Sequence, residues 1–255
     1  MLSNPTHLSW HKTIQDGHTI LAHKSLSEPV THDWFDAAFW EKQNAITGES
    51  KGRNTTYFIK YLGNNTESKQ TRHFVLRHYY RGGLVSKVLN DEFLYTGIEN
   101  TRSIAEFTML QKMVELDLPV PNPIAAMVTK VSGLWCRNDI LIERIVDAKD
   151  GFYWLISQNL TDQTWQNIGA TIKQFHQNGV YHSDLNIHNI MIDKNGKVFL
   201  IDFDRCEFKA PSDTWQQANL ARLLRSLEKE KIRNKPSTLP TDIGNNCYWD
   251  MGNDL

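Results

Sequence analysis

The chain has 255 residues, of which 40% are apolar, enough to bury the core of one large domain or of two lobes. Its 28 basic and 29 acidic residues nearly cancel, so the net field of the molecule cannot drive binding to nucleic acid or to a membrane. The three cysteines are far apart and lack CxxC spacing, which argues against a disulfide framework or a zinc site.

Strand patterns dominate the first half of the chain. Thr55–Leu62 and His73–Tyr80 flank a polar, turn-rich segment, which predicts an antiparallel hairpin. A helix is predicted within Thr101–Leu118, because its apolar residues recur at helical spacing, and Pro119 and Pro121 prevent its continuation.

Two more strands and a second helix follow. Pro123–Val131 and Asn138–Val146 have strand patterns and are joined through Ser132 and Gly133. From about residue 150 the pattern becomes helical, and a helix is predicted within Thr161–Gly179 with Gly179 as its C-terminal cap.

A short hairpin is predicted next, formed by Asn189–Asp193 and Lys197–Phe203 around the dipeptide Asn195-Gly196, which suits a type I′ turn. A last helix is expected to begin near Asp213. The order of elements predicts an α+β fold with a strand-rich N-terminal part and a mainly helical C-terminal part.

The stretch YHSDLNIHNIMID carries the most specific signal in the chain. His182, Asp184 and Asn189 have the spacing H-x-D-x-x-x-x-N, and Asp202-Phe203 follows after the hairpin. This set resembles the catalytic loop and the metal-binding Asp-Phe pair of protein kinases. The alternative is a solvated turn that contains these polar residues by coincidence.

The resemblance implies a role for each residue in phosphoryl transfer. Asp184 would orient an acceptor hydroxyl and accept its proton. Asn189 and Asp202 offer oxygen ligands of the kind that Mg²⁺ prefers. His182 is expected to pack and to form hydrogen bonds, and a metal cluster of His176, His182 and His188 is not expected.

In the N-terminal part, the same resemblance implies a basic residue on the third strand, paired with a glutamate on the following helix. Arg77 is in the position of the usual lysine, and Glu106 is its expected partner in nucleotide binding. Glu106 has a second interpretation, because Ser103–Glu106 also fits a helix capping box.

A loop that covers phosphate is expected within TGESKGRN. Gly48 and Gly52 would let backbone amides approach the phosphates, and Lys51 and Arg53 would lie near the charge. The alternative for this segment is an ordinary turn.

Three departures separate the chain from protein kinases. Residues 203–212 leave no room for an activation segment, Asn186 is in the place of the usual lysine, and Asp204 replaces the glycine of D-F-G. The chain is most similar to the Kdo and heptose kinase family of lipopolysaccharide core biosynthesis, through VLRHYYRGGLVSKV, LPVPNPIAA, YHSDLNIHNIMID, FLIDFDRCEF and W-x-x-x-NLARLLRSL.

This resemblance implies a bilobal protein-kinase-like fold with its active site between the lobes. The lobes would be residues 1–147 and 148–255, with a hinge near Glu143–Asp147. It also implies Mg²⁺ and ATP as cofactors, with transfer to the 4-hydroxyl of the Kdo sugar on a lipid A precursor. No signal-peptide core or transmembrane segment is evident, so a cytoplasmic protein, peripheral on the cytoplasmic face of the bacterial inner membrane, is expected.

Such an acceptor carries carboxylate and phosphate groups, which arginine and lysine bind well. The candidates are Arg81, Lys87, Arg222 and Arg225. On the last helix, a buried stripe is expected to comprise Leu220, Leu223, Leu224 and Leu227. The basic residues are expected on the opposite face, where they could meet the acceptor. The alternative is that this face is merely solvated. Neither a nucleic acid nor an obligate protein partner is expected.

Two other functions remain open from the sequence. One is a different kinase specificity, either a heptose kinase or a small Ser/Thr protein kinase without an activation segment. The other is a non-catalytic ATP-binding pseudokinase, suggested by Arg77 in the lysine position and by the incomplete glycine loop. The complete set of Asp184, Asn189 and Asp202 favours a catalyst.

Overall fold

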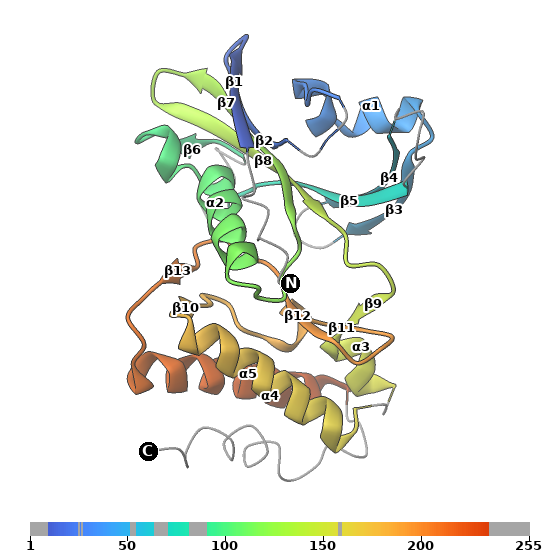
Figure 1. The fold of residues 1–255 in the computed structure, drawn as a ribbon, viewed down its shortest axis with the longest axis vertical. Helices are drawn as coiled ribbons and strands as arrows, with labels where there is room; N and C mark the ends of the chain where they lie inside the picture. The colour runs from blue at the N-terminus through green and yellow to red at the C-terminus, as the bar shows by residue number, and fades with distance from the viewer. Residues whose placement is uncertain are drawn as a thin grey trace, which may run out of the picture. The chain divides into compact units, whose positions relative to one another are not determined.

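The computed structural model describes residues 10–24, 26, 28–51, 55–63, 71–81, 91–157 and 160–234, with the backbone alone at Lys51 and at 232–234. The chain forms two compact units, one made of Met1–Glu115 and Pro121–Arg144 and the other of Leu116–Val120 and Ile145–Leu255. Figure 1 labels the helices and strands of both units.

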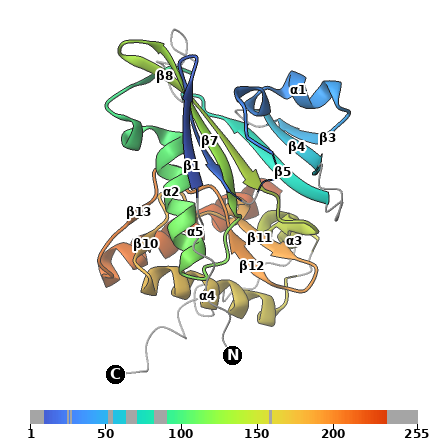
Figure 2. The same cartoon turned by 45° about the horizontal axis from the view of Figure 1, so that its top comes forward.

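The first unit is built on an antiparallel sheet with the strand order β1-β2-β7-β8-β5-β4-β3, and β6 pairs with β8. Figure 2 labels β1, β7, β8, β5, β4 and β3 of this sheet. The predicted β4–β5 hairpin is confirmed by its antiparallel register, and the two strands predicted on either side of Ser132 and Gly133 form β7 and β8, which also pair antiparallel. The strands are β1 (Trp10–Gln15), β2 (His18–His23), β3 (Ile46–Lys51), β4 (Thr55–Leu62), β5 (Thr71–His78), β6 (Phe93–Leu94), β7 (Pro123–Ser132) and β8 (Trp135–Glu143).

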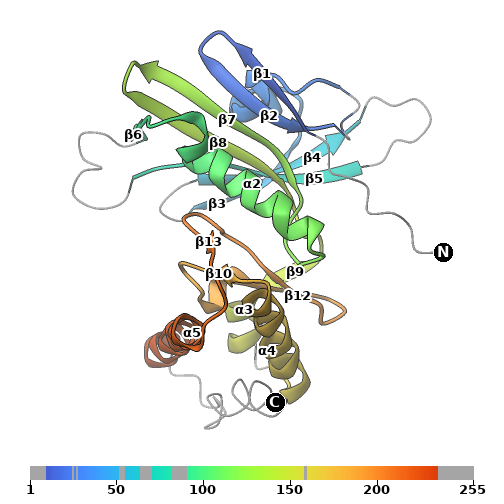
Figure 3. The ribbon, with the colours of Figure 1, turned by 60° about the vertical axis from the view of Figure 1, so that its left-hand side comes forward.

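Helix α2 (Arg102–Glu115) packs against β7 and β8, as Figure 3 shows. The helix predicted in this segment is therefore confirmed, and its apolar face buries Ile104, Phe107 and Leu110. It is preceded by the 3₁₀ turn η3 (Ile98–Asn100). The packing fixes the position of α2, and with it Glu106, relative to the sheet.

An aromatic core cluster joins the sheet to η1 (His32–Phe35) and α1 (Ala37–Lys42), two short helices that the sequence analysis did not predict. The indole nitrogen of Trp40 donates to the carbonyl of Trp34 at 2.8 Å, so this buried polar group has a partner. Tyr61 and Phe74 stack within the same cluster.

The second unit is mainly helical, with two small sheets of order β12-β11-β9 and β10-β13. Thr161 caps the first turn of α4 by accepting from the Thr164 amide at 3.2 Å. The elements are β9 (Ala148–Asp150), α3 (Gly151–Ile156), α4 (Asp162–Gln177), β10 (Val180–Tyr181), η4 (Ile187–Asn189), β11 (Ile190–Asp193), β12 (Val198–Leu200), β13 (Glu207–Phe208) and α5 (Asp213–Asn234).

The C-terminal end of α4 and the start of α5 agree with the sequence. Gly179 has φ +73° just beyond α4, and its amide donates to the His176 carbonyl at 3.0 Å, which confirms its predicted capping role. Helix α5 begins at Asp213, as predicted. None of the helices described here is long and apolar enough to cross a membrane.

Two local predictions were wrong. The β11–β12 connection is not a type I′ turn, because Gly196 has positive φ but Asn195 does not; the Gly196 amide instead closes a turn on the Asp193 carbonyl at 3.0 Å. Leu224 is 37% exposed and does not belong to the buried leucine stripe of α5.

The segment TGESKGRN, in which a phosphate-covering loop was expected, begins in strand β3, and its residues 48–51 pair with β4. Gly48 follows a register shift in this pairing, and an added Cβ would lie 3.4 Å from the Phe58 ring. A glycine inside a strand often indicates such a bulge, which explains why it looked like a loop signal in the sequence.

Candidate active site

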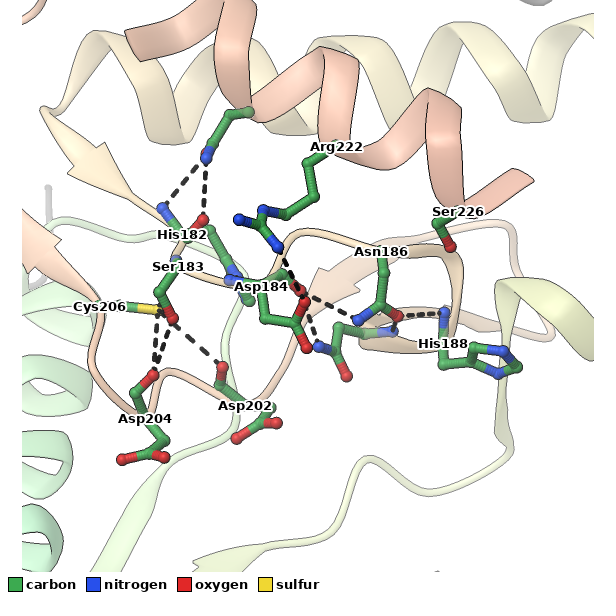
Figure 4. Close-up of polar contacts among 12 residues, drawn as sticks. His182, Ser183, Asp184, Asn186, His188, Asp202, Asp204, Cys206, Arg222 and Ser226 are labelled. Carbon is green, nitrogen blue, oxygen red and sulfur yellow. Dashed lines mark hydrogen bonds and ion pairs between the residues drawn. The ribbon is translucent and has the colours of Figure 1, made fainter. Parts of the chain in front are cut away.

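The loop after β10 is held in shape by its own asparagines (Figure 4). The Asn186 side chain donates to the Asp184 carbonyl at 3.1 Å and accepts from the amides of His188 and Asn189 at 2.9 and 3.2 Å. The amide of the Asn189 side chain donates to the same Asp184 carbonyl at 2.9 Å. These bonds use the backbone of Asp184, and its side chain remains 60% exposed.

His182 is buried and joins the two polar loops of the site. Its Nδ1 accepts from the Asp184 amide at 3.2 Å, which leaves the proton on Nε2, and Nε2 donates to the Ile201 carbonyl at 3.0 Å. Burial lowers the pKa of His182, so the neutral ring fits both bonds. The predicted packing and hydrogen-bonding role is confirmed.

The loop that carries Asp202 is bonded directly to the first loop. The Ile201 amide donates to the Asn189 carbonyl at 3.0 Å, and the Ser183 hydroxyl donates to the Asp204 carbonyl at 2.9 Å. Asp202 itself has φ 64°, a left-handed conformation that turns the chain immediately after Ile201.

Phe203 packs beneath these two loops. It is fully buried, stacks on Phe175 of α4 at a centroid distance of 5.9 Å, and lies 5.0 Å from the His182 ring. Because backbone bonds and a buried aromatic ring join the loops, the structure brings Asp184, Asn189 and Asp202 into one site.

The ligand set fits a hard divalent cation. The side-chain nitrogen of Asn189 is used in the bond to Asp184, which orients the amide and leaves its oxygen outside that bond. A neutral amide oxygen and the carboxylate of Asp202 are suitable partial ligands for Mg²⁺, which completes its shell with water and substrate phosphates.

Helix α5 supplies contacts that the sequence analysis missed. The buried Asn219 accepts from the His182 amide at 3.2 Å and donates to the His182 carbonyl at 2.8 Å. The hydroxyl of Ser226 accepts from the Ile187 amide at 3.2 Å. No signal in the sequence indicated these contacts, because their partners lie 37 and 39 positions away in the chain.

In the first unit, Arg77 and Glu106 form the predicted pair. Arg77 of β5 and the hydroxyl of Tyr79 both donate to Oε2 of Glu106, whose side chain is 2% exposed. Burial, followed by the negative charge of Glu106, raises the pKa of Tyr79 well above its usual value. The phenol therefore stays neutral and remains a donor.

The capping-box interpretation of Glu106 is wrong. Ser103 lies inside α2, and its hydroxyl donates to the Met127 carbonyl at 3.0 Å rather than capping the helix. Glu106 is directed to Arg77 and Tyr79, so its side chain does not reach back to a backbone amide at the start of the helix.

The other predicted site residues are less completely described. Arg81 packs over the rings of Phe93 and Trp135, each 5.4 Å from its guanidinium carbon, and Arg225 is exposed on α5. Gly52, Arg53, Lys87 and the side chain of Lys51 lie outside the described residues.

These features define a class of protein. An antiparallel sheet with an Arg–Glu pair between strand and helix, and a mainly helical unit with bonded His-x-Asp and Asp-Phe loops, make up a protein-kinase-like fold. Residues 37–238 match the lipopolysaccharide kinase (Kdo/WaaP) family. The chain belongs to this family.

Curated relatives extend the match over most of the chain. A protein of Mannheimia succiniciproducens named 3-deoxy-D-manno-octulosonic acid kinase is 42% identical over 224 residues, which cover 86% of this chain and 90% of that protein. Proteins of the same name from Haemophilus influenzae and Vibrio parahaemolyticus are each 41% identical, covering 86% and 82% of this chain and 90% and 84% of those proteins.

Two solved structures match the chain at lower sequence identity. A structure described as WaaP in complex with acyl carrier protein has 14% identity and a TM-score of 0.47, covering 82% of this chain and 85% of that chain. The Cydia pomonella granulovirus kinase PK-1 has 13% identity and a TM-score of 0.43, covering 64% of this chain and 52% of that chain.

Proposed function

We propose that the protein is an ATP-dependent kinase that transfers the γ-phosphate to the 4-hydroxyl of Kdo on a lipid A precursor. The supporting observation is the bonded set of Asp184, Asn189 and Asp202 in a chain similar to kinases of that name over most of its length. A non-catalytic module would have no use for this complete set.

In the proposed reaction, the acceptor oxygen forms a bond to the γ-phosphorus while the bond from that phosphorus to the ADP oxygen breaks. ADP leaves with the bonding electrons, and the hydroxyl proton passes to the carboxylate of Asp184. The 60% exposure of the Asp184 side chain suits a group that must meet an incoming sugar. Asn189 and Asp202 would hold the Mg²⁺ that neutralises the phosphates.

The first unit would bind the nucleotide. Arg77, held by Glu106, would contact phosphate through its planar fork, and Gly48, Lys51, Gly52 and Arg53 would cover the phosphates from β3 and the residues after it.

The acceptor would be bound by basic residues. Arg81, Lys87, Arg222 and Arg225 were assigned to this role from the sequence, and exposed Arg225 suits the carboxylate of Kdo or a lipid A phosphate. Such an acceptor implies peripheral contact with the anionic cytoplasmic face of the bacterial inner membrane.

The test is transfer of labelled γ-phosphate from Mg-ATP to a Kdo-bearing lipid A precursor, beside a precursor without Kdo, a heptose-bearing acceptor and a protein substrate. Label on the Kdo acceptor alone, lost in Asp184→Ala, is the expected result. Label on the heptose acceptor or on protein would overturn the sugar assignment. ATP binding without transfer to any acceptor would overturn the kinase assignment.

A further inference from the structure

One face of α5 follows the catalytic loop over its whole length. Asn219 binds the backbone of His182, Ser226 binds the Ile187 amide, and the carboxylate of Glu230 lies 3.6 Å from the ring of His188. Residues at these intervals share one side of a helix. The helix therefore fixes both ends of the loop relative to its own surface.

Arg222 lies on this same face, between Asn219 and Ser226. Its Nη1 is 3.7 Å from Oδ1 of Asp184, an ion pair that Figure 4 draws as a dashed line. Because the neighbouring contacts hold the loop at both sides, the position of this guanidinium relative to the reacting carboxylate is set by the fold and not by the ion pair alone.

The loop itself offers no such positive charge at Asp184. Asn186, two residues further along the chain, is neutral, and its amide is used in bonds to Asp184 and to two backbone amides. Within the described part of the chain, Arg222 is the basic side chain in an ion pair with Asp184.

The guanidinium retains donors for a ligand. A separation of 3.7 Å is an ion-pair distance that is too long for a hydrogen bond, so the pair with Asp184 does not use the N–H groups of Arg222. With side chains 44% and 60% exposed, the pair also contributes little to stability. A contribution to the stability of the fold therefore does not explain why Arg222 lies beside Asp184.

We propose that Arg222 is a further catalytic residue, whose guanidinium binds the oxygens of the phosphoryl group during its transfer. This inference rests on the proposed function. As the bond to the ADP oxygen breaks and the bond to the acceptor oxygen forms, negative charge is shared among the equatorial phosphoryl oxygens and the leaving oxygen. Arg222 would stabilise that charge beside Asp184 while Asp184 accepts the hydroxyl proton. This replaces its assignment to acceptor binding alone.

The experiment compares Arg222→Gln and Arg222→Lys with wild type, and uses Lys231→Gln as a control that removes an exposed charge further along the same helix. For each protein, kcat and KM are measured for phosphate transfer to the Kdo acceptor, and slow hydrolysis of Mg-ATP is measured without any acceptor. Thermal unfolding and Mg-ATP affinity report on folding. Added guanidinium ion is tested with Arg222→Ala.

For Arg222→Gln we expect kcat to fall about 10² to 10³-fold in both transfer and hydrolysis, with an unchanged acceptor KM. The kcat of Arg222→Lys should fall less, because lysine keeps the positive charge but lacks the planar pair of N–H donors of the guanidinium. The kcat of Lys231→Gln should match that of wild type. Guanidinium should restore part of the Arg222→Ala rate, which a structural role does not predict.

Two results would overturn the inference. One is a raised acceptor KM in Arg222→Gln with both kcat values retained, which would make Arg222 an acceptor contact. The other is a loss of rate that follows thermal stability and does not respond to guanidinium. If wild type transfers no phosphate to Kdo, the proposed function fails, and the hydrolysis comparison still decides the role of Arg222.

Discussion

At the scale of single residues, the contacts of Asp184 divide cleanly between its backbone and its side chain. Its carbonyl holds Asn186 and Asn189, whereas its carboxylate is exposed. Asp184→Asn should therefore lower kcat by about 10² to 10⁴ and leave Mg-ATP affinity and stability unchanged. Steady-state kinetics and nucleotide titration measure this. Asp33→Asn, an exposed site on η1, is the control. A loss below tenfold would contradict a role as the proton acceptor.

Site residues that belong to a motif with fixed spacing could be predicted from the sequence. Residues whose role depends on contacts with distant parts of the chain could not. Asp184, Asn189 and Asp202 were found because their spacing is specific, and Glu106 was paired with Arg77 from their places on helix and strand. Asn219 was missed because its partner His182 lies 37 positions away, and an asparagine on a helix carries no sign of such a contact. The exposure of Leu224 likewise depends on packing around α5.

At the scale of elements, the connection from α4 to β10 depends on a glycine. Gly179 has φ +73°, and an added Cβ would lie 2.3 Å from the Lys209 carbonyl, next to the β10–β13 pairing. Gly179→Ala should lower the free energy of unfolding by about 1 to 3 kcal/mol, because both backbone conformation and space oppose a side chain.

Urea denaturation measures this change. Gly133→Ala is the matched control, because an added Cβ there meets nothing within 4 Å and the backbone is not left-handed. An equal effect of the two substitutions would show that the close approach at Gly179 is not a constraint.

Helix α5 should couple stability to catalysis through Asn219. Asn219→Leu would leave the buried amide and carbonyl of His182 without their side-chain partner. We expect a loss of about 2 to 4 kcal/mol in the free energy of unfolding and a lower kcat in the folded fraction. Ser226→Ala, which removes a single bond to Ile187, should cost less. Equal stability of Asn219→Leu and wild type in urea titrations would contradict this anchoring.

Element type was predictable where the apolar period was strong, as in α2, α4 and the strands β4, β5, β7 and β8. The local backbone geometry of turns and bulges was harder to predict from the sequence. The Asn-Gly pair indicated the β11–β12 hairpin but not its turn, because Asp193 accepts the amides of Asn195 and Lys197 with its side chain and closes a wider loop. At β3, pairing with β4 overrides the loop signal of Gly48.

At the scale of the whole molecule, the formal charge of −1 hides histidines whose pKa values are shifted in both directions. In the first unit they oppose one another, because burial lowers the pKa of His23 while that of His78 is raised. In the first unit, burial opposes the charge of His78, but its hydrogen bond to Asp139 and the nearby carboxylates raise its pKa. In the second unit, burial lowers the pKa of His182 and lowers that of His176 to about 4. Acidification should therefore affect the two units differently.

The direction in which the stability of each unit changes with pH follows from the protons that its folded and unfolded forms bind. Below pH 6.5 the unfolded chain protonates its histidines, whereas buried His176 stays neutral until about pH 4, so the second unit loses stability as pH falls from 6.5 towards 4. From His176 the loss should be roughly 1.5 kcal/mol between pH 6.5 and 5. His78 acts in reverse, since its raised pKa adds stability at low pH that is lost as pH rises above 6.5.

Hydrogen exchange at pH 6.5 and 5, corrected for the intrinsic rate, can separate the units. We expect protection of α4 and α5 to fall at pH 5 while protection of β5 and β8, which hold His78 and Asp139, is maintained. His176→Gln should flatten the pH dependence in α4 and α5, because glutamine has no proton to bind in this range. Equal loss in both units, or an unchanged slope in the variant, would show that His176 does not cause the acid sensitivity of the second unit.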